Sequence, residues 1–178
     1  MKTAFALTFL ALFAAFSIAV KTQLWRNKSP VAAVKIDEPM PNFELPDVNG
    51  KMVKFSEAIR DKKVVLINFW ASWCGPCRVE MPTFEKLYRD EKDHGFLILA
   101  IDEDKERAKL DDYLKAKPLS FPILIDNDNA LVEKLKIESF PTTVLVRGNG
   151  KVWQVLEGVQ SYIEYTVRGA LHDPKQQQ

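Results

Sequence analysis

The chain has 178 residues, 47% of them hydrophobic, and it carries 25 basic and 24 acidic side chains. This length and composition suit one globular domain with a short appendage. Because the net charge is close to zero and the basic residues form no cluster, we expect no nucleic acid among the partners. Both cysteines belong to one motif, which excludes a framework of disulfides as the source of stability.

The amino-terminal segment has the composition of a membrane-directed sequence. Its apolar tract begins at Ala4 and ends at Val20, and two small residues near its end could precede a cleavage site. A tract of about 17 residues is long for a signal peptide and just long enough to cross a bilayer. Residues 1–21 are therefore expected to be a signal anchor or a removable signal peptide, and residues 22–35 a tether. A buried core helix is the alternative, but no amphipathic pattern marks a face for it. Basic residues after the tract outnumber those before it, which opposes export on a simple positive-inside count.

A β-hairpin is predicted directly after the tether. Phe43 and Leu45 alternate with polar neighbours, and hydrophobic residues return at Met52. Between them, Asn49 and Gly50 supply the residues with positive φ that a tight hairpin turn requires.

The centre of the chain combines a buried strand, a C-x-x-C motif and a helix. Residues 64–67 are apolar and mostly β-branched, and the run is too short for a helix, so a strand is predicted. Apolar residues near helical spacing follow over 79–88, after Cys74 and Cys77. Unpaired N–H groups and the positive end of the helix dipole stabilise a thiolate at such a helix start. Cys74 is therefore the predicted nucleophile, and Cys77, one turn further on, is the resolving thiol.

Two other interpretations of the cysteine pair are a structural disulfide and half of a zinc site. Zinc needs about four ligands, and the chain has no third cysteine. Its two histidines, His94 and His172, are far from the motif in sequence. A bridge across two residues closes too short a loop to remove much chain entropy. The pattern favours a redox-active pair.

Downstream of the motif, strands and helices alternate. The predicted elements are a strand over 96–101, a helix ending near 117, a strand over 121–125, a helix over 129–135, strands over 142–146 and 151–156, and a helix over 161–171. The acidic run at 102–104 is expected to cap the first of these helices, whose charged residues form a solvated face. The order predicts an α/β fold with a mixed sheet covered by helices on both faces.

Three segments carry a resemblance to a known family. Residues 69–77 have the sequence FWASWCGPC, which resembles the active-site segment of the thioredoxin superfamily. Residues 41–47 and 49–51 are similar to the opening of its membrane-tethered TlpA/ResA branch, and residues 140–143, FPTT, resemble the cis-proline loop of the family. The resemblance covers about residues 36–171.

The resemblance implies a thioredoxin fold over residues 36–172, with an added N-terminal β-hairpin and a central insertion. Residues 173–178 are expected to be a flexible tail. No second domain is expected, and the chain is expected to be a monomer without a cofactor or bound metal.

The same resemblance implies a role for Pro141, whose peptide bond is expected to be cis and to face the dithiol. The backbone of Phe140 is then able to pair with an extended client peptide. An ordinary trans proline at the start of a strand is the alternative. Trp73 is expected to contribute contact surface or simple packing, whereas Trp70 belongs to the core.

Glu80 lies one helical turn after Cys77, so its carboxyl is able to approach the resolving thiol. A carboxyl whose pKa is raised by burial could exchange that thiol's proton. The alternative is a solvated helix carboxylate. Asn68 stands where cytoplasmic thioredoxins carry a buried aspartate, and because an amide cannot relay protons, the importance of Glu80 increases.

The dipeptide between the cysteines also bears on function. Gly75 keeps the approach to Cys74 open, and Pro76 fixes φ inside the turn. The pair resembles that of reducing thioredoxins rather than oxidising members. The resemblance therefore implies an extracytoplasmic, membrane-anchored thiol–disulfide oxidoreductase that reduces protein clients, with apocytochrome c as the expected client. A membrane-embedded thiol reductase is the implied electron donor.

Two alternatives remain open at this point. Peroxiredoxins share the Pro-x-Phe-x-Leu opening, but Ile67 occupies the position of the proline that precedes their nucleophile. A non-catalytic binding module on a thioredoxin scaffold is the other alternative, and the intact C-x-x-C motif opposes it.

Overall fold

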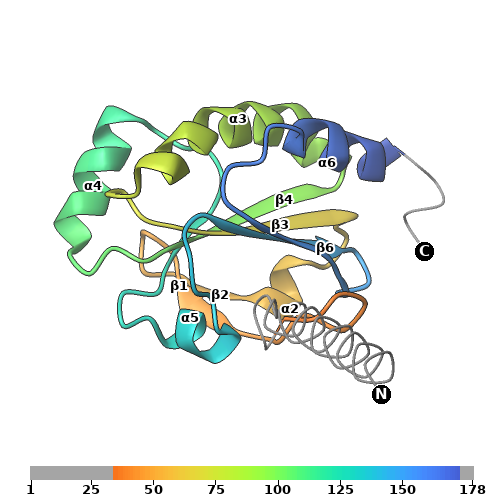
Figure 1. Cartoon of the computed structure of the whole chain (residues 1–178), viewed down its shortest axis with the longest axis horizontal. Coiled ribbons are helices and arrows are strands. Elements are labelled where there is room, and N and C mark those ends of the chain that lie inside the picture. The colour runs from red at the N-terminus through yellow and green to blue at the C-terminus, as the bar shows by residue number, and fades with distance from the viewer. Residues whose placement is uncertain (1–33, 173–178) are drawn as a thin grey trace, which may run out of the picture. The chain divides into compact units, whose positions relative to one another are not determined.

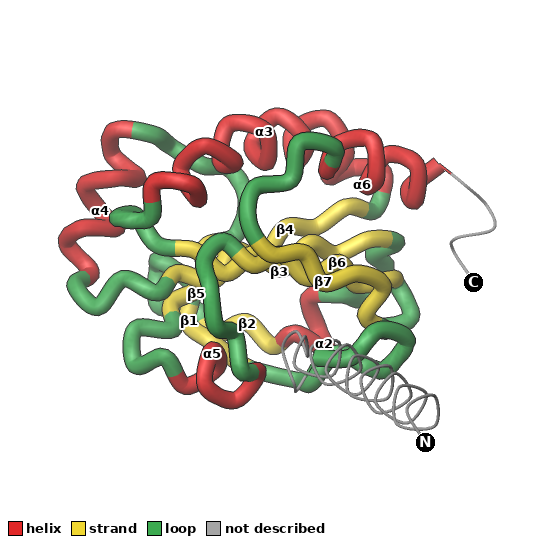
Figure 2. The backbone as a smooth tube through the Cα atoms, in the orientation of Figure 1, coloured by secondary structure: helices red, strands yellow, loops and turns green. Residues whose placement is uncertain are grey.

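The computed structural model describes residues 34–172 (Figures 1 and 2). The elements are β1 (Glu44–Pro46), β2 (Met52–Lys54), α2 (Phe55–Ala58), β3 (Val64–Trp70), α3 (Gly75–Glu91), η1 (Lys92–His94), β4 (Phe96–Asp102), α4 (Arg107–Ala116), β5 (Ile123–Ile125), α5 (Ala130–Leu135), β6 (Thr142–Arg147), β7 (Val152–Glu157) and α6 (Ile163–His172). The predicted membrane tract and tail lie outside these residues. Within residues 34–172, no helix is long and apolar enough to cross a membrane.

The main sheet has five strands in the order β5-β4-β3-β6-β7. β3, β4 and β5 are parallel, whereas β6 pairs antiparallel with β3 and β7 pairs antiparallel with β6. Every residue of β3 and β4 is buried, as expected for central strands that are covered on both faces. The mixed sheet confirms the predicted fold class.

Helices cover both faces of this sheet. Figure 1 shows α3 and α6 above the sheet, and α2, α5 and the β1–β2 hairpin below it. Alternating side chains of β3 supply two cores: Leu66 and Trp70 lie under α3 and α6, whereas Val65 and Ile67 belong to the opposite core. Trp70 is fully buried, which confirms its predicted place in the core.

The amino-terminal hairpin forms where the alternation predicts it, with Leu45 paired to Val53. Its turn differs from the prediction, because only Gly50 has a positive φ (81°) and Asn49 does not. The side chain of Asp47 replaces the second left-handed residue by accepting the backbone N–H groups of Asn49 and Lys51.

The acidic run at 102–104 does not cap a helix, so that prediction is wrong. Asp102, Glu103 and Asp104 are each at most 4% exposed, and α4 begins only at Arg107 with no side-chain cap. The reason lies in the sheet. β4 continues to Asp102, which pairs with Trp70 of the central strand, so the acids are enclosed at the carboxyl end of the sheet.

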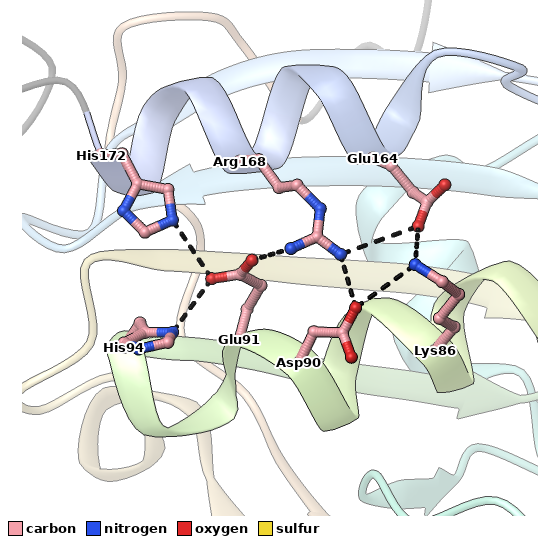
Figure 3. A network of polar contacts seen from close by, with 7 residues as sticks. All are labelled: Lys86, Asp90, Glu91, His94, Glu164, Arg168 and His172. Atoms are coloured by element: carbon pink, nitrogen blue, oxygen red, sulfur yellow. Dashed lines mark hydrogen bonds and ion pairs between the residues drawn. The ribbon is translucent and has the colours of Figure 1, made fainter.

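Charged side chains join α3 to α6 at the end opposite the motif (Figure 3). Glu91 is buried, and Arg168 donates to it and to Asp90. His94 Nδ1 lies 3.1 Å and His172 Nε2 lies 3.4 Å from the same Glu91 oxygen, Oε2. This network fixes the carboxyl-terminal helix along the helix that carries the cysteines.

Candidate active site

The turn between β3 and α3 carries the first cysteine. It closes through a hydrogen bond from the N–H of Cys74 to the carbonyl of Ala71, 3.1 Å long. Cys74 is the N-cap of α3, and Pro76 lies in the first helical turn. N–H groups of that turn have no acceptor within the helix, so the N–H that proline lacks costs no hydrogen bond. The local sequence therefore places Cys74 at the positive end of a 17-residue helix.

The two cysteines form a disulfide with an S–S distance of 2.04 Å. The N–H of Cys77 donates to the Sγ of Cys74 at 3.2 Å, a contact that also favours negative charge on that sulfur. Cys77 is fully buried, whereas Cys74 retains 5% exposure. Cys74 and Cys77 therefore differ in burial and in hydrogen bonding.

Trp73 and Phe140 meet beside the disulfide. Trp73 is 61% exposed, and its ring stands edge-on to that of Phe140 with centroids 6.2 Å apart. The Phe140–Pro141 peptide bond is cis, as predicted. Both aromatic residues line a pocket of about 480 Å³ that extends towards Val132 and Ile137. The motif and the proline loop, far apart in sequence, therefore share one surface.

Glu80 is buried, at 3% exposure, which excludes the alternative of a solvated carboxylate. Its Oε1 accepts the N–H of Gln160 at 3.0 Å, and its Oε2 has no hydrogen-bond partner among the described residues. Burial raises the pKa of Glu80 to about 7, although the Gln160 N–H opposes this shift. A second pocket, of about 240 Å³, is lined by Val79, Glu80 and Val159.

Asn68 is fully buried on the α3 side of the sheet, and its Nδ2 donates to Thr143 Oγ1 at 3.0 Å. The amide is held by the neighbouring strand β6. It contributes no titratable proton to the space beneath the motif.

The acids at the end of β4 were not assigned to the site by the sequence analysis. Asp104 accepts two hydrogen bonds from Ser72, in the turn that leads to Cys74. Burial is the main cause that raises the pKa of Asp102 to about 8 and that of Glu103 to about 9. One signal in the sequence could have identified them: the acids and the C-x-x-C motif each directly follow an apolar strand. The carboxyl ends of adjacent parallel strands meet at one edge of a sheet.

Gly75 and Pro76 are both exposed, and a Cβ added at Gly75 would meet nothing within 4 Å. The dipeptide therefore leaves the Cys74 side of the turn open. Among residues 34–172, no group of three or more acidic, histidine or cysteine side chains is arranged to hold a metal ion.

Residues 36–155 match the family model described as the AhpC/TSA family. The chain belongs to this family. It is 32% identical over 121 residues to the thiol-disulfide oxidoreductase ResA of Bacillus subtilis (strain 168). The aligned region covers 68% of this chain and 66%, just under two thirds, of that protein. It is 33% identical over 152 residues to ResA of Geobacillus kaustophilus (strain HTA426), covering 85% of this chain and 84% of that one.

Among solved structures, a candidate thiol:disulfide interchange protein DsbE from Chlorobium tepidum superposes with a TM-score of 0.70 at 28% identity. The match covers 78% of this chain and 96% of the other. This AhpC/TSA family member is thus a ResA-like thiol–disulfide oxidoreductase with a thioredoxin-like fold, and Cys74–Cys77 is its active-site disulfide. The predicted class of chemistry is confirmed.

Proposed function

We propose that this oxidoreductase works as a reductant of protein disulfides, with Cys74 as the attacking thiol. The observation that carries the proposal is the asymmetry of the pair. Cys74 caps α3, accepts the Cys77 N–H and is the less buried residue of the pair. A thiolate is most stable, and most accessible to a client, at that position.

The exchange then runs in two steps. The Cys74 thiolate attacks one sulfur of a client disulfide, and the other client sulfur leaves as a thiolate. The Cys77 thiolate next attacks Cys74 Sγ, which forms the Cys74–Cys77 bond and releases the second client thiolate. The client gains two electrons, and the protein ends in the oxidised form that the structure shows.

Glu80 serves as the proton acceptor for Cys77 in this scheme. It follows Cys77 by one helical turn, and its unpaired Oε2 is buried on the same helix. A pKa of about 7 suits a group that must both take and return a proton near neutral pH. Asn68 cannot perform this role because its amide does not titrate.

The client surface in this proposal includes Trp73 and Phe140, with Gly75 and Pro76 at its edge and the buried Pro141 holding the backbone of Phe140 in place. An extended peptide beside Phe140 presents its disulfide to Cys74. The aromatic contact between Trp73 and Phe140 supports this placement, because it joins an exposed ring and a half-buried ring from two separate loops.

The cellular setting is proposed from the tract between Ala4 and Val20 and from the likeness to ResA. The domain is held at a membrane on its outer, extracytoplasmic side, or is released there if the segment is cleaved. A membrane-embedded thiol reductase returns electrons to Cys74 and Cys77. Apocytochrome c, whose haem-binding thiols must be reduced, is the proposed client.

Reduction of insulin in the presence of dithiothreitol tests the activity. We expect wild-type protein to accelerate insulin precipitation and Cys74→Ser to have no effect above the dithiothreitol background. Equal activity of the two proteins would overturn the proposed mechanism. Consumption of hydrogen peroxide in place of insulin reduction would instead identify a peroxidase.

The client is tested separately. Cys77→Ser cannot resolve a mixed disulfide, so it should retain clients on Cys74 when expressed in the native membrane. Recovery of apocytochrome c by diagonal electrophoresis and mass spectrometry supports the client assignment. Recovery of other proteins only would reject that client while leaving the chemistry intact.

A further inference from the structure

Asp104 holds the turn that carries Cys74. Its Oδ2 accepts the backbone N–H of Ser72 at 2.8 Å, and its Oδ1 accepts the Ser72 hydroxyl at 3.0 Å. Both residues are buried, with Asp104 at 1% exposure and Ser72 at 9%. A buried carboxylate that accepts two such hydrogen bonds makes a strong and directional contact.

Backbone pairing with β3 holds the segment that carries Asp104 in place. Asp104 follows β4, whose last residue, Asp102, lies in register with Trp70 of β3. The N–H of Glu103 also donates to the carbonyl of Trp70 at 2.9 Å, so the segments that follow β4 and β3 are still hydrogen-bonded to each other just before Ser72. The turn is therefore tied at Trp70 and again at Ser72, two residues before Cys74.

The charged groups around Asp104 come from three elements. Asp102 ends β4, two residues before Asp104, and burial is the main cause of its raised pKa, with the nearby Asp104 carboxyl contributing. The charge of Arg107, on α4, lowers the pKa of Asp102, whereas Asp126, after β5, raises that of Glu103. Asp102, with a pKa of about 8, keeps its proton near neutral pH, so it adds no negative charge beside Asp104.

We propose that Asp104 is a positioning residue for the thiol–disulfide exchange: through Ser72 it fixes the turn so that Cys74 stays within reach of Cys77. The step that depends on this is resolution, which is intramolecular. Cys77 attacks Cys74 Sγ, the bond between Cys74 and the client breaks, and the client leaves as a thiolate with the electron pair. Such a reaction is fast only while the two sulfurs are held in a reactive geometry.

Ellman's reagent separates the two steps. The reduced full-length protein, in detergent, releases one thionitrobenzoate when Cys74 attacks the reagent and a second when Cys77 resolves the mixed disulfide. Stopped-flow absorbance gives a bimolecular rate for the first phase and a unimolecular rate for the second. We expect Asp104→Asn to slow the second phase about tenfold and to change the first phase much less.

Ser72 variants separate positioning from charge. Ser72→Ala removes one hydrogen bond to Asp104 and no charge, so we expect the second phase to slow about threefold. Ser72→Thr keeps the hydroxyl and should restore the wild-type rate. In the double variant, the effects of Asp104→Asn and Ser72→Ala should be less than additive, because both break the same contact. Asp112→Asn, an exposed carboxyl of α4, is the matched control.

A purely structural role for Asp104 predicts a lower melting temperature with an unchanged second phase below it, and that result overturns the proposal. Additive effects of the two substitutions overturn it as well, because Asp104 would then act without Ser72. The inference rests on Cys74 being the attacking thiol. Failure of that assignment is distinguishable, because mass spectrometry would then find the mixed disulfide with thionitrobenzoate on Cys77 rather than on Cys74.

Discussion

Glu80 and Gln160, 80 positions apart in the chain, are joined by a hydrogen bond of 3.0 Å from the Gln160 backbone N–H to Glu80 Oε1. The bond ties α3 to the segment that leads into α6. Burial of the Glu80 carboxyl raises its pKa to about 7, although this hydrogen bond opposes the shift.

The first prediction concerns Glu80→Gln. Below pH 7 the Glu80 carboxyl is protonated and cannot accept a proton, whereas above pH 7 the carboxylate can do so. The wild-type rate of mixed-disulfide resolution should therefore rise through about pH 7. In the variant, the resolution rate should no longer rise near pH 7, and at pH 8 it should be about ten- to a hundredfold lower than in the wild type. Single-turnover kinetics between pH 5 and pH 9 measure both effects.

Glutamine keeps an oxygen that can accept the Gln160 N–H, so the fold of the Glu80→Gln variant should be retained. Glu57→Gln, an exposed carboxyl of α2, serves as the control and should reproduce the wild-type profile. An unchanged profile in Glu80→Gln would show that the buried carboxyl takes no part in proton transfer.

A second prediction distinguishes the two thiols. In the reduced protein, iodoacetamide at pH 7 should alkylate Cys74 well before Cys77, because the helix start lowers the pKa of a cysteine to about 3.5–7.5. Cys77 is fully buried and should remain protonated. Peptide mass spectrometry of a labelling time course, with Cys74→Ser and Cys77→Ser as references, checks the order. Faster labelling of Cys77 would reverse the proposed roles.

A third prediction follows from the buried acids of β4. The pKa values of Asp102 and Glu103 are raised to about 8 and about 9, so above pH 4.5 the native state holds protons that the unfolded chain has lost. The free energy of unfolding should therefore fall as the pH rises from about 4 to 9. Urea denaturation of the oxidised protein at several pH values measures this slope.

Asp102→Asn should flatten the slope of stability against pH up to about pH 8, because the asparagine has no proton to lose. The exposed Asp112→Asn should keep the wild-type slope. The same slope in all three proteins would mean that Asp102 is ionised in the native state at neutral pH.

The fourth prediction concerns the network between α3 and α6 (Figure 3). Arg168→Gln removes the cation that donates to Glu91, whose side chain is only 4% exposed. We expect the free energy of unfolding to fall by about 1–3 kcal/mol, because a buried acceptor loses its charged donor. Chemical denaturation of the oxidised protein at pH 7 gives the value.

Lys86→Gln is the comparison within the same network. Lys86 bonds Asp90 and Glu164, but its side chain is 64% exposed, and such pairs contribute little in water. Its loss should therefore change stability much less than the loss of Arg168. A larger effect at Lys86 would show that burial of Glu91 is not what makes this network stabilising.

The sequence by itself determined the local frame of the active site. The apolar run of β3, the C-x-x-C motif and the following helical pattern are consecutive, so their geometry depends on backbone propensities and short-range hydrogen bonds. These placed Cys74 at the start of α3 and Cys77 one turn inside it. The segment around Pro141 was also recognisable from the resemblance alone, and its cis bond agrees with that prediction.

Only the tertiary structure decided which side chains surround this frame. The acids at 102–104 look like a helix cap in sequence, and they are buried because β4 runs beside β3 to the same edge of the sheet. Burial, and the pKa shifts that follow from it, depend on what packs against a residue from distant segments. For the same reason, neither the bond between Asp104 and Ser72 nor that between Gln160 and Glu80 follows from any local pattern, since each partner lies on a separate element.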